Sequence, residues 1–173
     1  SRPGQQGLQS LLRRMATAHH LDRLPAEEQS APPLQMLRAQ ALRSASRENE
    51  AVDILSKVEK SAAGDPRLLY SLGMIFADWK RYADAERAFS QALEAAPANF
   101  DILYNLGLAA LRAGHFDRAK EVLEIAQRQQ PRDVDLLQNL ARVYAERHQQ
   151  DQAIVLLVEA EKIAPDRPDI QMF

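Results

Sequence analysis

The chain has 173 residues, a formal net charge of −2 and no cysteine. A charge this close to zero gives no overall attraction to nucleic acid, and the lack of cysteine excludes disulfides and cysteine-ligated zinc. No stretch of 18 consecutive apolar residues occurs, so we expect no membrane insertion. We expect a soluble protein and favour the cytoplasm over the periplasm as its compartment.

Residues 1–31 are predicted to form an N-terminal amphipathic helix followed by a proline-bounded linker. Leucines and a methionine recur at helical spacing between Leu8 and Leu24, and arginines occupy the polar side. Three roles stay open for this segment: a capping helix for the region that follows, a segment that docks on a partner or on the chain itself, and a membrane-surface helix.

From residue 32 onward the sequence repeats itself with a fixed period and without an insertion. We divide this region into a degenerate first repeat, 32–65, and three regular ones, 66–99, 100–133 and 134–167. Several columns hold the same type of residue in the regular repeats: Leu69, Leu103 and Leu137; Leu72, Leu106 and Leu140; Ala85, Ala119 and Ala153; Phe89, Leu123 and Leu157; Pro97, Pro131 and Pro165. A fixed period of this length predicts a solenoid of stacked helix pairs.

The repeated polar and small residues have local roles in this interpretation. Asp65, Asn99 and Asp133 are predicted to cap the first helix of each regular repeat. Gly73 and Gly107 share a column with Ala141, which indicates close contact between the two helices of a repeat. We expect leucine at position 107 to overpack this contact and alanine there to be nearly silent.

These columns resemble the tetratricopeptide repeat, and the resemblance covers residues 66–167 most clearly. It implies an all-α, right-handed superhelical solenoid of helix–turn–helix repeats, here expected from a bacterium. It also implies that the first helices line a concave groove that binds a partner protein or an extended peptide. The groove residues expected here are Arg67, Tyr70, Ser71, Met74, Asp101, Tyr104, Asn105, Leu108, Arg112, Gln138, Asn139 and Arg142, with Met36, Leu37, Gln40 and Arg43 as minor members from the first repeat.

Asn105 and Asn139 occupy the same column in successive repeats, so they are expected to form a short ladder along the groove. An amide side chain has both donors and an acceptor, which suits the backbone of an extended peptide. Replacing both by alanine should therefore weaken partner binding with little change in melting temperature. Arg112 and Arg142 are expected to pair with acidic residues of the groove, such as Asp101 or Asp135.

No catalytic constellation, phosphate-binding loop, metal site or cofactor site is recognisable, so we expect a non-catalytic interaction module that does not bind nucleic acid. Two alternatives stay open: a substrate-selecting accessory domain of a larger glycosyltransferase- or sulfotransferase-like enzyme, and an assembly factor of a bacterial envelope machine. Residues 168–173 read as the start of a further helix in a truncated chain. Val155 and Val158 are then expected to be uncovered, which makes a homodimer possible.

Overall fold

The computed structural model describes residues 30–167, and these residues form eight α-helices and no strand. The chain divides between Ala63 and Gly64 into two compact units. The helix predicted around residues 8–24 and the one predicted to start at residue 168 lie outside the described residues. The helices are α4 (Pro32–Ser44), α5 (Glu48–Ser61), α6 (Pro66–Asp78), α7 (Tyr82–Ala95), α8 (Phe100–Ala113), α9 (Phe116–Gln129), α10 (Val134–Glu146) and α11 (Gln150–Ile163).

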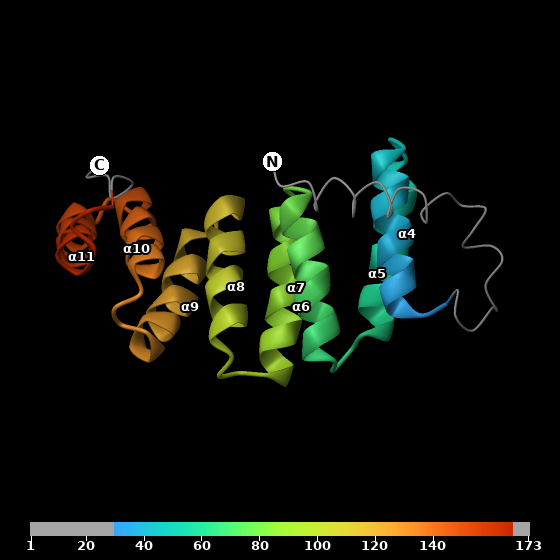
Figure 1. Cartoon of the computed structure of the whole chain (residues 1–173), viewed down its shortest axis with the longest axis horizontal. Helices are drawn as coiled ribbons and strands as arrows, with labels where there is room; N and C mark the ends of the chain where they lie inside the picture. The colour runs from blue at the N-terminus through green and yellow to red at the C-terminus, as the bar shows by residue number, and fades with distance from the viewer. Residues whose placement is uncertain (1–29, 168–173) are drawn as a thin grey trace. The chain divides into compact units, whose positions relative to one another are not determined.

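The second unit is a stack of three helix pairs, α6 with α7, α8 with α9 and α10 with α11 (Figure 1). The pairs also contact one another, because α7 packs on α8 and α9 packs on α10. Each pair lies within one of the three regular repeats of the sequence. The predicted all-α architecture of stacked helix pairs is therefore confirmed.

The first helix of each pair in the second unit begins at the predicted cap. The Asp65 carboxylate accepts hydrogen bonds from the backbone N–H groups of Arg67 and Leu68, at 3.0 and 3.1 Å. The side-chain oxygens of Asn99 and Asp133 each accept one from the third helical residue. These bonds satisfy backbone donors that have no partner within the helix.

The turn inside each pair has a left-handed residue in one fixed column. Ser46, Lys80, Gly114 and His148 follow one another at the repeat period and have φ values of 62°, 59°, 81° and 58°. The residue after each donates its backbone N–H to the carbonyl five residues earlier, for example from Arg81 to Phe76 at 2.8 Å. This is the Schellman arrangement that ends a helix and reverses the chain.

The small residues of the first helices lie directly against large residues of the second. A Cβ atom at Gly107 would lie 2.4 Å from Cγ of Leu123, and one at Gly73 would lie 2.5 Å from the ring of Phe89. Both large side chains are buried. The predicted close contact is confirmed, but the expected tolerance of alanine at 107 is wrong, because even a methyl group would overlap a buried leucine.

The first unit contains the pair α4 and α5, whose core includes Ala51, Leu55 and Val58. On α4 the buried residues are Met36 and Ala39. Met36 was expected as a minor groove residue, and that expectation is wrong. In the column of Leu69, α4 has the polar residue Gln35, and its apolar neighbour Met36 is buried instead.

The last described helix carries exposed apolar side chains. Val155 is 65% exposed and Ile154 is 46% exposed, whereas Val158 is half-buried. The expected exposure is thus found at Val155. Within residues 30–167, no helix combines the length and the apolar content that crossing a bilayer requires.

Candidate functional site: the face of the first helices

The expected groove residues from Arg67 to Arg142 all lie on α6, α8 and α10, and none of them is buried. We call the surface that they form the first-helix face. Arg67, Ser71, Asp101 and Arg112 are exposed there, and Met74 is 43% exposed. The half-buried members are Tyr70, Tyr104, Asn105, Leu108, Gln138, Asn139 and Arg142.

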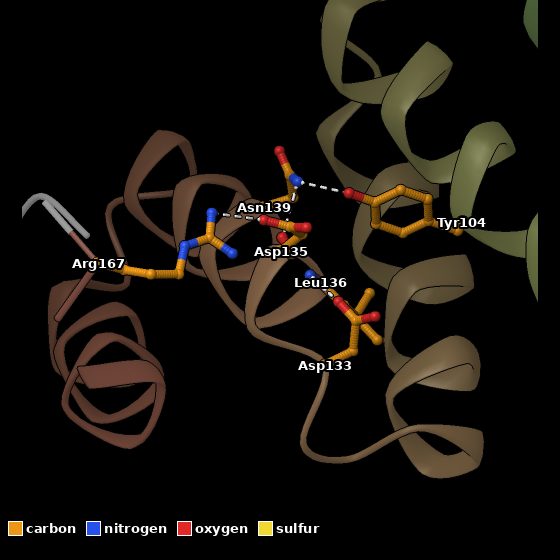
Figure 2. Close-up of polar contacts among 6 residues, drawn as sticks. All are labelled: Tyr104, Asp133, Asp135, Leu136, Asn139 and Arg167. Atoms are coloured by element: carbon orange, nitrogen blue, oxygen red, sulfur yellow. Dashed lines mark hydrogen bonds and ion pairs between the residues drawn. The ribbon is translucent and has the colours of Figure 1, made fainter. Parts of the chain in front are cut away.

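Two tyrosine–asparagine pairs connect neighbouring repeats across this face. The Asn105 amide donates to the Tyr70 hydroxyl at 3.0 Å, and the Asn139 amide donates to the Tyr104 hydroxyl at 3.1 Å. Each amide also donates to a backbone carbonyl one turn earlier in its own helix, at 2.8 Å in both cases. Figure 2 shows the second pair, with Tyr104 reaching from α8 to Asn139 on α10.

These bonds change what the two asparagines can offer to a ligand. A side-chain amide has two N–H donors, and both are engaged within the chain. The side-chain oxygen of each, Oδ1, has no hydrogen-bond partner among the described residues. Asn105 and Asn139 therefore present an acceptor, where the sequence predicted donor and acceptor together. Their internal bonds also contradict the expectation that alanine at both positions leaves the melting temperature nearly unchanged.

The tyrosine hydroxyls supply the missing donor. Burial raises the pKa of Tyr70, with a smaller contribution from the charge of Asp101. Burial likewise raises the pKa of Tyr104, together with the charges of Asp135 and Asp133. Both phenols therefore keep their proton at neutral pH. Each accepts a bond from an asparagine and still has its own O–H to donate.

A cavity of about 340 Å³ opens at one end of the first-helix face, where α6 and α8 begin. Tyr70 lies in its wall, and residues between α7 and α8 contribute to it. Its lining combines apolar surface with one cation and one carboxylate. The lining residues include Pro66, Arg67, Ala96, Asp101 and Ile102.

The charged residues of this face differ in their partners. Asp135 forms an ion pair with Arg167, at 2.8 Å between Oδ1 and Nη2 (Figure 2). Arg112 and Arg142 form no ion pair with a carboxylate in residues 30–167, so the pairing expected for them is wrong. Their side chains lie near the middle or the end of their helices, whereas Asp101 and Asp135 lie in the first turn.

The sequence placed the expected groove residues on one face of the first helices, but it did not predict their contacts. Tyrosine precedes asparagine by 35 residues in both pairs, which is one residue more than the repeat period. The two partners therefore fall in different columns, and a comparison within columns does not reveal the pair. Nothing in the repeat pattern singled out Arg167, Ala96 or Ile102. Within the described part of the chain, no cluster of histidine and acidic side chains could hold a metal ion.

Tetratricopeptide repeat family models match the chain over residues 36–100, 78–135 and 110–173. The solved structure "MamA MSR-1 C2" is similar, with a TM-score of 0.69 and 18% identity over 91% of this chain and 94% of that one. YrrB, described as a TPR protein with an unusual peptide-binding site, gives a TM-score of 0.71 and 20% identity over 95% of this chain and 84% of its own. At these identities the two likenesses show the fold alone. No curated protein matches the chain.

Proposed function

The chain belongs to the tetratricopeptide repeat family of protein-interaction modules, and from that premise we propose that its first-helix face binds an extended peptide segment of a partner protein. The face consists of the outward sides of α6, α8 and α10. Its polar centre is formed by the two tyrosine–asparagine pairs. The likeness to YrrB is in keeping with a peptide ligand, although it concerns the fold only.

The observation that carries the proposal is the pairing of a donor with an acceptor at two successive repeats. Each pair has one hydroxyl proton, on Tyr70 or Tyr104, and one amide oxygen, on Asn105 or Asn139, that no described residue uses. An extended peptide has one N–H and one C=O per residue that need partners. A pair on the face can therefore accept from the peptide N–H and donate to the peptide C=O.

The internal hydrogen bonds of the asparagines support the same proposal. They hold each amide in one orientation before a ligand arrives, so less conformational entropy is lost on binding. Met74 and Leu108 lie on the same face and offer apolar contacts to peptide side chains. Recognition through backbone groups makes the affinity tolerant of the peptide sequence.

A selected peptide provides the test. A display library of short unstructured peptides is panned against the full chain, and the best binder is synthesised and measured by calorimetry. Replacing Tyr70 and Tyr104 by phenylalanine together removes the two donors and keeps the rings. We expect the double variant to bind the selected peptide about tenfold more weakly than the wild-type chain, because each lost donor leaves a peptide carbonyl unpaired.

Tyr144→Phe is the matched control. The Tyr144 hydroxyl donates to the Glu124 carboxylate of α9 at 2.5 Å, so this variant also loses a tyrosine hydrogen bond, but away from the first-helix face. Peptide affinity should be unchanged in the control. Equal affinity of the Tyr70 and Tyr104 double variant and the wild-type chain would contradict the proposed binding mode.

A further inference from the structure

Asp101 and Asp135 occupy the same position in successive repeats. Each is in the first turn of its helix, and the backbone carbonyl of each accepts a bond from the asparagine of a tyrosine–asparagine pair. Both residues are exposed. The two repeats thus place a carboxylate at the same position of the helix. The two sites differ in the residues around that carboxylate.

One charged neighbour that differs is Arg167. Arg167 brings a guanidinium to within 2.8 Å of the Asp135 carboxylate. The residue one repeat before Arg167 is Asp133, whose carboxylate accepts the backbone N–H of Leu136 at 2.8 Å (Figure 2). The repeat of Asp101 therefore has an acid in the column where the next repeat has its cation. Within residues 30–167, Asp101 forms no ion pair.

A second observation distinguishes Asp101 from an ordinary acid in a first turn. It lines the 340 Å³ cavity at the start of α6 and α8, which Tyr70 also lines. The apolar part of the lining comes from Pro66, Ala96 and Ile102. A cavity with apolar walls and a carboxylate in its lining suits a long aliphatic side chain that ends in a positive charge.

We propose that Asp101 receives the guanidinium or ammonium group of an arginine or lysine in the bound peptide. The aliphatic part of that side chain lies against Pro66 and Ile102, and its charged end takes the role toward Asp101 that Arg167 has toward Asp135. This inference rests on the proposed peptide-binding function and gives it a sequence preference at one position.

Arg67 lines the same cavity, and its positive charge repels the charged end of an incoming arginine or lysine. It forms no ion pair with Asp101, so the carboxylate stays available. The simplest competing explanation is that Asp101 only stabilises the N-terminus of α8 through the helix dipole. Asp151 offers a control for that effect, because it is an exposed acid in the first turn of α11, a second helix of a repeat.

The probe is a set of three short acetylated peptides of alternating serine and valine with one central variable residue. That residue is arginine, its neutral isostere citrulline, or glutamate. Each peptide is titrated into the isotopically labelled full chain, and the dissociation constant is read from the backbone amide signals of residues 67–71 and 99–105. We expect the arginine peptide to bind about fivefold more tightly than the citrulline peptide, and the glutamate peptide to bind weakest.

Three variants complete the test. Asp101→Asn should make the arginine and citrulline peptides bind equally, and Arg67→Gln should increase the preference for arginine. Asp151→Asn should leave the preference as it is in the wild-type chain. Equal binding of the arginine and citrulline peptides to the wild-type chain would overturn the inference and leave the proposed function standing. Absence of signal changes on α6, α8 and α10 with all three peptides, up to millimolar concentration, would overturn both.

Discussion

Asn105 and Gly107 show how closely each residue of this fold is tied to its neighbours. Asn105 lies on the first-helix face, and its amide donors bond to a neighbouring repeat and to its own helix. Two residues later, Gly107 faces the opposite way and lies against Leu123 of the second helix. The step between them is about 200° around the helix, which separates the first-helix face from the packing face.

The packing at Gly107 leads to a prediction about stability. Gly107→Ala should lower the free energy of unfolding by about 1–2 kcal/mol, because the overlap with Leu123 outweighs the better helix propensity of alanine. Chemical denaturation of the variant and the wild-type chain measures this difference.

Leu123→Ala provides the background that isolates the cause. In that variant the obstructing side chain is absent, so adding Gly107→Ala should be neutral or stabilising, and the two substitutions should couple strongly. A Gly107→Ala variant as stable as the wild-type chain would contradict this prediction. It would show that α8 and α9 can move slightly apart without a loss of stability, since the following pair has Ala141 at this position.

At the level of the helices, the first and second helices of each pair begin in different ways. The first helices α6, α8 and α10 have side-chain caps, whereas the second helices have none. The second helices follow a left-handed residue, and the Schellman bonds of that turn place the chain directly at their start. Only one of the four left-handed positions in this column is a glycine, Gly114.

These turns give a pair of opposite predictions. Gly114→Ala should destabilise the chain by about 1 kcal/mol, and Lys80→Gly should stabilise it by about 0.5–1 kcal/mol, because non-glycine residues are strained in the left-handed region. No atom lies within 4 Å of a Cβ built at Gly114, so its effect reports the backbone alone.

Thermal unfolding of the two variants measures both effects. Both effects are smaller than the backbone strain itself, because glycine has more conformational entropy in the unfolded chain, which offsets part of the strain. A destabilised Lys80→Gly variant would mean that the lysine side chain has a stabilising contact that outweighs its backbone strain.

For the molecule as a whole, the distribution of exposed apolar residues is uneven. The large apolar side chains exposed among the described residues are Met74 on α6 and the adjacent Ile154 and Val155 on α11. A solenoid buries the face of each repeat against the next, and apolar side chains that stay exposed on such a face tend to associate. The homodimer considered from the sequence stays a prediction. We expect α11 to form its interface.

Light scattering over a concentration series tests this prediction. We expect the full chain to associate with increasing concentration, and a variant with Ile154→Lys and Val155→Lys to remain monomeric, because charge replaces the apolar contact. Met74→Lys is the control, since it removes an exposed apolar side chain from a different helix. A wild-type chain that stays monomeric at all concentrations would refute the prediction.

The sequence by itself determined the repeat length, the helix pairs, their caps and which residues share the first-helix face. These features follow from local rules: a fixed repeat period, apolar stripes at helical spacing, and capping residues in phase. Such rules act within one helix or between neighbouring helices, so one sequence is enough to apply them.

Only the tertiary structure decided how side chains that are far apart in the sequence meet. It showed that the amide donors of Asn105 bond to Tyr70 and to the backbone. It also showed that Arg167 pairs with Asp135, whereas Asp101 lines a cavity and has no ion-pair partner among the described residues. It also showed that a methyl group at Gly107 would overlap Leu123. These outcomes depend on distances of a few tenths of an ångström between elements that the periodicity aligns but does not place, since packing and hydrogen bonding are decided at contact.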